Sequence, residues 1–195
     1  MRGSVSWFAI GALAVGLALS GCANNGPSEM AWESEPPDSA IDSAIGTPAA
    51  QRLAGSFLRS SDASNDVGAA ALRRAGAPVT VYATDPSFRD DPGRTLERAG
   101  IASYIAVPVD LAGRSAADTV QLEPSPPYLP RAMATGVEET SQPRAADVRL
   151  LLDYPTHTWF AWTRTRVTVL TSGTTPALAG KEFDSAEFRA WLQTR

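Results

Sequence analysis

The feature that most limits what this sequence can fold into is an apolar run near the N-terminus. This run ends close to the single cysteine of the chain. The run extends from Val5 to Leu19, and Arg2 is the only charged residue before it. A membrane-spanning helix needs ~20 apolar residues, whereas a shorter run behind a positive charge is typical of a secretory signal. We therefore expect the folded part to lie downstream. Because Cys22 is the only cysteine, that part must fold without an intramolecular disulfide.

The run ends in the sequence Leu19-Ser20-Gly21-Cys22, which resembles the lipobox of bacterial lipoproteins. This resemblance implies that residues 1–21 are a signal peptide and that the Cys22 thiol carries a diacylglycerol group after cleavage. It implies a lipid-anchored protein at the extracytoplasmic face of a cell membrane, where two or three acyl chains would hold it durably. An ordinary signal peptide with a chance cysteine and an uncleaved anchor helix are the alternatives. The resemblance covers residues 1–22 only.

An acidic segment follows the cysteine. Residues 23–46 contain five acidic residues, no basic residue and three prolines. This composition is typical of segments that do not bury a core, so residues 22–46 are expected to be a disordered tether of at most ~80 Å. Met30 and Trp32 could form a partner-binding motif within it, although a plain linker is the simpler interpretation.

Residues 47–195 are expected to form a single globular domain. They hold 16 basic and 16 acidic residues, so the domain is formally neutral and the net charge of −4 comes mainly from the tether. A hydrophobic content of 44% supports a packed core. The absence of a basic surplus argues against nucleic acid as a partner.

The pattern of this domain indicates an α+β fold. We expect a mixed or mainly antiparallel sheet of about 5–6 strands, with helices packed on one face. Helices are predicted after Thr47-Pro48, from Asp66 to Ala75, and from about 184 to 193 at the C-terminus, where Asp184 and Glu187 form a capping box. Residues 131–145 are interpreted as a long loop.

No motif for catalysis, cofactor or metal binding stands out. His157 is the only histidine, and no nucleophile elbow, phosphate-binding loop or dinucleotide fingerprint is present. A zinc site of the usual Cys/His type is excluded within one chain. Acidic residues cluster only loosely, and none forms an obvious catalytic pair: Asp85, Asp90, Asp91, Glu138, Glu139 and Asp153.

The best candidate for ligand binding is an aromatic strand with two arginines after it. Trp159 would point to one face of the sheet, and Phe160 and Trp162 to the other. An exposed aromatic side chain near Arg164 and Arg166 would suit a carbohydrate or a peptide. The alternative is a central strand that is buried on both faces.

The sequence thus predicts a membrane-anchored envelope lipoprotein that acts as a non-enzymatic binding or accessory module without a cofactor. Its partner would be an envelope protein or a wall polymer, and its oligomeric state is not predicted. The alternative is a carboxylate-dependent hydrolase of cell-wall glycans, which would need two acids ~5–9.5 Å apart in one cleft.

Overall fold

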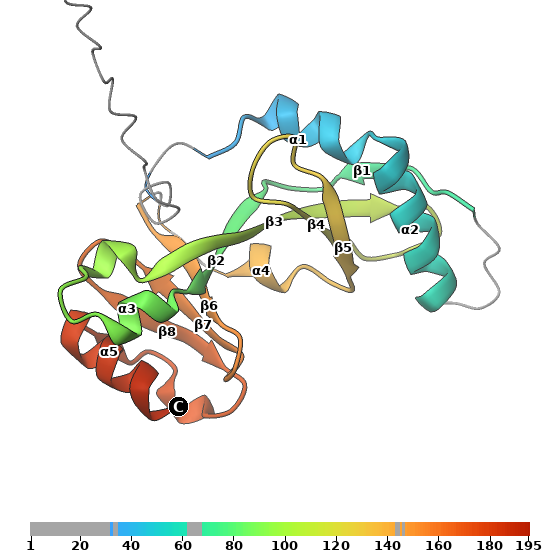
Figure 1. Cartoon of the computed structure of the whole chain (residues 1–195). Helices are drawn as coiled ribbons and strands as arrows, with labels where there is room; N and C mark the ends of the chain where they lie inside the picture. The colour runs from blue at the N-terminus through green and yellow to red at the C-terminus, as the bar shows by residue number, and fades with distance from the viewer. Residues whose placement is uncertain (1–31, 33–34, 62–67, 143–144, 146) are drawn as a thin grey trace, which may run out of the picture.

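The fold is α+β, with one mostly antiparallel sheet and helices packed against it (Figure 1). The structure, a computed structural model, describes residue 32 and residues 35–61, 68–142, 145 and 147–195. The described strands are β1 (Leu72–Arg74), β2 (Val79–Thr84), β3 (Gly100–Leu111), β4 (Asp118–Leu122), β5 (Pro130–Ala134), β6 (Arg149–Asp153), β7 (Thr158–Trp162), β8 (Val167–Ser172) and β9 (Glu182–Phe183). The described helices are α1 (Asp38–Ile45), α2 (Pro48–Ser61), α3 (Pro86–Asp90), α4 (Glu138–Ser141) and α5 (Ser185–Thr194), with short 3-10 turns η2 (Leu96–Arg98) and η3 (Pro176–Leu178).

The sheet consists of two antiparallel groups joined by one parallel pairing. Its strand order is β5-β4-β3-β2-β6-β7-β8-β9, and β1 pairs with the far end of β3. β2 and β6 run parallel, with Val81 opposite Leu150 and Ala83 opposite Leu152, whereas the other pairings are antiparallel. The long strand β3 reaches from β2 to the group that contains β1, β4 and β5 (Figure 1).

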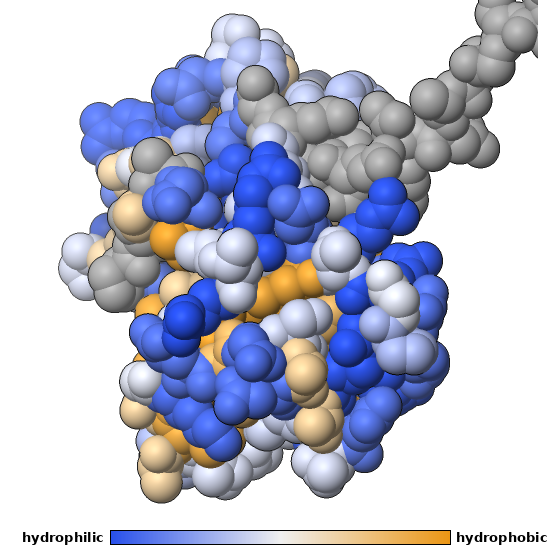
Figure 2. Space-filling view, turned by 90° about the vertical axis from the view of Figure 1, so that its left-hand side faces the viewer, coloured by the Kyte–Doolittle hydropathy of each residue, from blue (hydrophilic) through white to orange (hydrophobic). Residues whose placement is uncertain are grey.

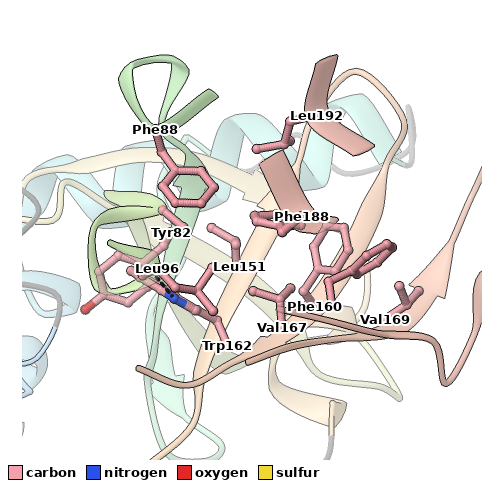
Figure 3. Packing of buried hydrophobic residues seen from close by; sticks show 12 residues of the cluster. Tyr82, Phe88, Leu96, Leu151, Phe160, Trp162, Val167, Val169, Phe188 and Leu192 are labelled. Carbon is pink, nitrogen blue, oxygen red and sulfur yellow. Dashed lines mark hydrogen bonds between the residues drawn. The ribbon is translucent and has the colours of Figure 1, made fainter. Parts of the chain in front are cut away.

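Four of the five described helices cover the same face of the sheet, here called the helical face. α1 packs over β3 and β4, where Ile41 belongs to one buried cluster with Ile105 and Val107, and α2 packs beside it near β1 and β5. At the other end, α3 and α5 cover β6, β7 and β8, where Phe88 and Phe188 join one core cluster (Figure 3). α4 lies on the opposite face, so the expectation of helices on one face is correct for four helices and wrong for α4.

Seen from the end that carries α3 and α5, hydrophilic side chains cover most of the surface (Figure 2). Apolar side chains show mainly in the spaces between them. In the part of the chain that the structure describes, no helix combines the length and the apolar character needed to cross a membrane.

The two clearest helix predictions are confirmed. Thr47 accepts a hydrogen bond from the Ala50 amide at the start of α2, with Pro48 as its first residue. At the start of α5, the Asp184 side chain accepts bonds from two backbone amides, and Glu187 accepts one from the Asp184 amide. Local capping chemistry therefore fixes where both helices begin.

The expectation that residues up to 46 form a disordered tether is wrong for its last part. Asp38–Ile45 is the helix α1, and its residues Ile41, Ala44 and Ile45 are buried against the sheet. These three positions are spaced so that they lie on one face of a helix. The acidic residues of this segment occupy the other side, where Asp38 and Asp42 both pair with Arg74.

The strand count of 5–6 is also corrected, because the sheet has nine strands. The helix predicted from Asp66 to Ala75 is wrong where it is described, since Leu72–Arg74 forms β1. The predicted loop 131–145 contains most of β5 and the whole of α4. These elements are short and take their conformation from their neighbours in the sheet, so local patterns alone did not indicate them.

The packing of α1 generates a first prediction. Replacing Ile41, which is fully buried, with alanine should lower the free energy of unfolding by about 2–5 kcal/mol, because a cavity would open between α1 and the sheet. Urea denaturation checks this, with Ser43→Ala on the exposed side of α1 as the control. Equal stability of the two variants would mean that α1 does not belong to the folded unit.

Candidate ligand-binding site

The side chains of the aromatic strand form no exposed surface. β7 lies between β6 and β8, and its side chains Trp159, Phe160 and Trp162 are all buried. Phe160 and Trp162 pack under α5 and η2, where the Trp162 indole donates a hydrogen bond to the Leu96 carbonyl (Figure 3). Trp159 packs on the opposite face. The strand is central and buried on both sides, so these rings stabilise the core.

The two arginines after this strand are exposed and already paired. They lie in the turn between β7 and β8, not on the strand itself. Arg164 pairs with Glu97 at 3.0 Å, and Arg166 pairs with Glu182 at 2.6 Å. The structure therefore separates Arg164 and Arg166 from the buried rings with which the sequence had grouped them.

Trp32 packs against the folded domain although it lies in the predicted tether. Its indole N–H donates a hydrogen bond of 2.9 Å to the Glu97 carbonyl. Its ring and the ring of Trp162 pack edge to face, with 4.9 Å between the ring centroids. The guanidinium groups of Arg164 and Arg149 lie over the Trp32 ring, with their Cζ atoms 4.9 and 5.8 Å from its centroid. A tryptophan in an otherwise polar segment was the sequence signal for this contact. Met30 and Cys22 lie outside the described residues.

Three residues further on, the same segment binds β2 on the helical face. The Glu35 carboxylate accepts a hydrogen bond of 2.7 Å from the Thr80 hydroxyl and lies 3.6 Å from Arg149. We call the stretch from Glu35 to Pro37 the arm. The arm runs extended into α1, with Pro37 at φ −65° and ψ 138°.

A hollow of about 390 Å³ opens beside the arm. Its volume falls within the range of ~300–1,000 Å³ that is common for ligand pockets. The floor comes from β2 and β3, one wall from the arm and the other wall from the loop between β4 and β5. The lining residues are Thr80, Tyr82 and Ala102 on the floor, Glu35, Pro36 and Pro37 on the first wall, and Pro124, Ser125, Pro126 and Tyr128 on the second. A smaller hollow of about 260 Å³ adjoins it and shares Glu35 and Thr80.

Tyr82 connects this hollow to the core. Its ring packs edge-on against Trp162 at 5.5 Å, whereas its hydroxyl points away from the other side chains of the cluster (Figure 3). Burial and the nearby Glu35 carboxylate raise the pKa of the Tyr82 phenol to about 12, against an opposing effect of Arg149. The phenol is therefore neutral at physiological pH and can donate or accept a hydrogen bond.

Tyr128 enters the second wall with a strained backbone. Its φ of 56° lies in the left-handed region, which a residue with a bulky side chain rarely adopts. Its half-buried ring packs against the cluster under α1, and its amide donates a hydrogen bond to the Ser125 carbonyl. A strain of this kind persists only where the surroundings hold it, and it is common at ligand sites.

The acidic residues that could serve a hydrolase have structural partners instead. Buried Glu139 accepts a hydrogen bond of 3.0 Å from the Tyr104 hydroxyl, and Glu138 accepts one of 2.8 Å from the Trp159 indole. These contacts hold α4 on the sheet, and burial together with Glu139 raises the pKa of Tyr104. His157, at φ 48°, lies 3.6 Å from Glu138. Neither glutamate lines the two hollows described above.

The remaining candidate acids are also engaged. Asp153 is fully buried and contacts Arg195 at 2.7 Å, Thr156 at 2.7 Å and Thr84 at 3.0 Å. In the loop after β2, each acid has a local role: Asp85 caps α3 and pairs with Arg94, Asp90 pairs with Arg89, and Asp91 accepts a bond from the Gly93 amide. Among the described residues, no group of three or more potential metal ligands comes together.

Comparison with known proteins gives no guide to this site: no family model, curated protein or solved structure matches the chain.

The strain at Tyr128 generates a second prediction. Tyr128→Gly and Tyr128→Ala both remove the ring, but only glycine adopts a positive φ without a steric cost. The glycine variant should therefore be more stable than the alanine variant by about 1 kcal/mol, as measured by urea denaturation. An alanine variant of equal or greater stability would show that the backbone at Tyr128 is not strained.

The environment of Tyr82 generates a third prediction, on the dependence of stability on pH. A phenol whose pKa is ~10 in the unfolded chain and about 12 in the fold contributes stability that is complete below pH ~10. This contribution is lost as the pH rises toward 12, because the unfolded chain then releases a proton that the fold retains. Tyr82→Phe should flatten the decline of the unfolding free energy in this pH interval. Tyr154→Phe, at an exposed tyrosine, is the control and should leave the decline unchanged.

Proposed function

We propose that this chain is a lipid-anchored, extracytoplasmic binding module that holds part of an envelope partner in the hollow beside its arm. The observation that carries the proposal is the composition of that hollow. One wall is built by the arm, which follows Trp32 in the sequence, and the other by a proline-rich loop. The anchor and the binding site are thus parts of one continuous segment.

The lipid anchor is supported by the sequence alone, since Cys22 precedes the described residues. Contact of Trp32 with the sheet changes the expected reach of the domain. Ten residue steps separate Cys22 from Trp32, and at ~3.3 Å per residue they span at most ~33 Å. This is less than half of the ~80 Å expected for a free tether. A module anchored in this way works close to the membrane and suits a partner that lies there too.

The chemistry of the hollow supports binding better than catalysis. Its walls offer four proline rings and two tyrosines, and Glu35 is its one charged lining residue. A hydrolase of the two-carboxylate class needs a second acid facing the first across the substrate. The contacts of Glu138, Glu139 and Asp153 with buried aromatic, threonine and arginine side chains support structural roles for these acids.

The anchor generates a fourth prediction. In a bacterial host, the membrane-associated product should carry a diacylglycerol group on Cys22, as seen by mass spectrometry. Cys22→Ala should lose both this mass and membrane retention, because only a thiol accepts the group. Ser20→Ala is the matched control and should retain both, since it keeps a small residue before the cysteine. An unmodified wild-type product that is released into the medium would contradict the lipoprotein assignment.

A further inference from the structure

The loop between β4 and β5 presents an unusually exposed apolar side chain. Leu129 is 57% exposed, and Tyr154 is the only other large hydrophobic residue with an exposed side chain in the part of the chain that the structure describes. The hydroxyl of Tyr154 is hydrogen-bonded, whereas the side chain of Leu129 has no polar atom and is better placed away from water. Pro126 and Pro127 are exposed as well and extend this apolar surface. We call residues 125–129 the loop tip.

The loop tip is held in one shape by its own hydrogen bonds. The Tyr128 amide donates to the Ser125 carbonyl at 2.9 Å, and the Glu123 amide donates to the Leu129 carbonyl at 2.8 Å. The ring of Tyr128 packs inward against the cluster under α1, and its φ of 56° turns the chain at this point. Leu129 is therefore held outside by an ordered loop. An apolar side chain that is fixed in this way can be buried against a second surface at a low cost in conformational entropy.

The loop tip lies on the same side of the domain as Trp32 and the arm. Ser125, Pro126 and Tyr128 line the hollow opposite the arm, so only the width of the hollow separates the two segments. Trp32, three residues before the arm, packs on Trp162. In Figure 1 the loop between β4 and β5 rises beside α1, the helix that follows the arm.

A short connection to the proposed anchor brings this side of the domain toward the bilayer. Cys22, the proposed lipidation site, and Trp32 are ten residue steps apart, which span at most ~33 Å. A domain of about 150 residues is roughly 40 Å across. While Trp32 stays docked, the connection is too short to pass around the domain and place its opposite side against the membrane. The side that carries Trp32, the arm and the loop tip therefore faces the bilayer.

The charges next to the loop tip suit a contact that is mainly apolar. Arg131 is exposed and donates a hydrogen bond of 2.8 Å to the Ser103 carbonyl, and among the described residues it has no acidic partner. Exposed Glu123 precedes the tip and offsets this charge. An arginine beside apolar groups can reach lipid phosphates while its stem lies along the acyl chains. A leucine and proline surface bordered by one arginine thus suits the boundary between lipid headgroups and acyl chains.

The anchor also removes the need for a strong contact. Insertion of one leucine side chain is too weak to recruit a free protein to a membrane. A connection of at most ~33 Å keeps the loop tip at a high effective concentration near the lipid surface, so a weak contact suffices there.

We propose that the loop tip inserts Leu129 into the headgroup boundary of the membrane that carries the anchor, with Arg131 at the level of the lipid phosphates. This inference rests on the proposed function, because it needs the lipid anchor at Cys22. It gives the domain one orientation at the bilayer, with the hollow beside the arm close to the lipid surface.

Fluorescence quenching tests the inference with the full-length lipidated protein in phosphatidylcholine vesicles that contain spin-labelled lipid. Cys22 is the only cysteine, and lipidation consumes its thiol, so Ser125→Cys supplies the one thiol that can take a fluorophore. This fluorophore should lose about half of its emission to the spin-labelled lipid. The same label on Ala177→Cys, an exposed site in η3 beside β8, near the other end of the strand order, should lose almost none.

Two substitutions at the exposed position 129 test the role of the leucine in the Ser125→Cys background. Leu129→Ser should remove the quenching, because serine has no apolar surface to bury, and Leu129→Met should retain it. Equal quenching at positions 125 and 177, or quenching that survives in Leu129→Ser, would overturn the inference.

The mass of the same preparation separates this failure from that of the proposed function. A diacylglycerol on Cys22 without quenching that depends on Leu129 would leave the anchored module standing and remove the loop contact. Absence of the diacylglycerol would overturn both proposals, because no tether would then hold the domain at the membrane. Support requires the diacylglycerol together with quenching at position 125 that is lost in Leu129→Ser.

Discussion

The parallel pairing of β2 with β6 is the interaction on which the rest of this structure depends. It is the link that joins the antiparallel group β1–β5 to the antiparallel group β6–β9, through three register pairs centred on Tyr82 and Leu151. On the helical face, α1 and α2 cover the first group and α3 and α5 cover the second. The boundary between the two sets of helices therefore falls over β2, and the hollow lies along this boundary.

The N-terminal segment fills part of the boundary and leaves the remainder open. Trp32 packs against the buried Trp162, and Glu35 accepts a hydrogen bond from Thr80, which is a buried polar residue of β2. A buried hydroxyl without a partner would destabilise the fold, so the Glu35 contact has a structural role in addition to its place in the wall of the hollow. The loop that carries Tyr128 closes the other side, and the space between them is too wide for the side chains present to fill.

Sequence patterns predicted the elements that are governed by local chemistry. The capping box of α5, the Thr47-Pro48 start of α2 and the α+β class were all readable, because hydrogen bonds within a few residues determine them. α1 was missed because its acidic side dominates the composition, although Ile41, Ala44 and Ile45 have helical spacing. The hollow could not be predicted from the sequence, for a different reason. Glu35, Tyr82 and Tyr128 are far apart in sequence, and they come together only through the packing of the arm and of the loop between β4 and β5 beside β2.

The position of Glu35, Pro36 and Pro37 between Cys22, the proposed lipidation site, and α1 has a mechanical consequence. In a protein held at Cys22, any force between the bilayer and the domain passes along the chain through Trp32 and then through these three residues before it reaches the helix. The Trp32 and Glu35 contacts would yield first, because they are few and only part-buried, whereas α1 is held by a buried apolar face. Tension would thus remove one wall of the hollow while the sheet stays folded, and an occupied hollow would resist that tension.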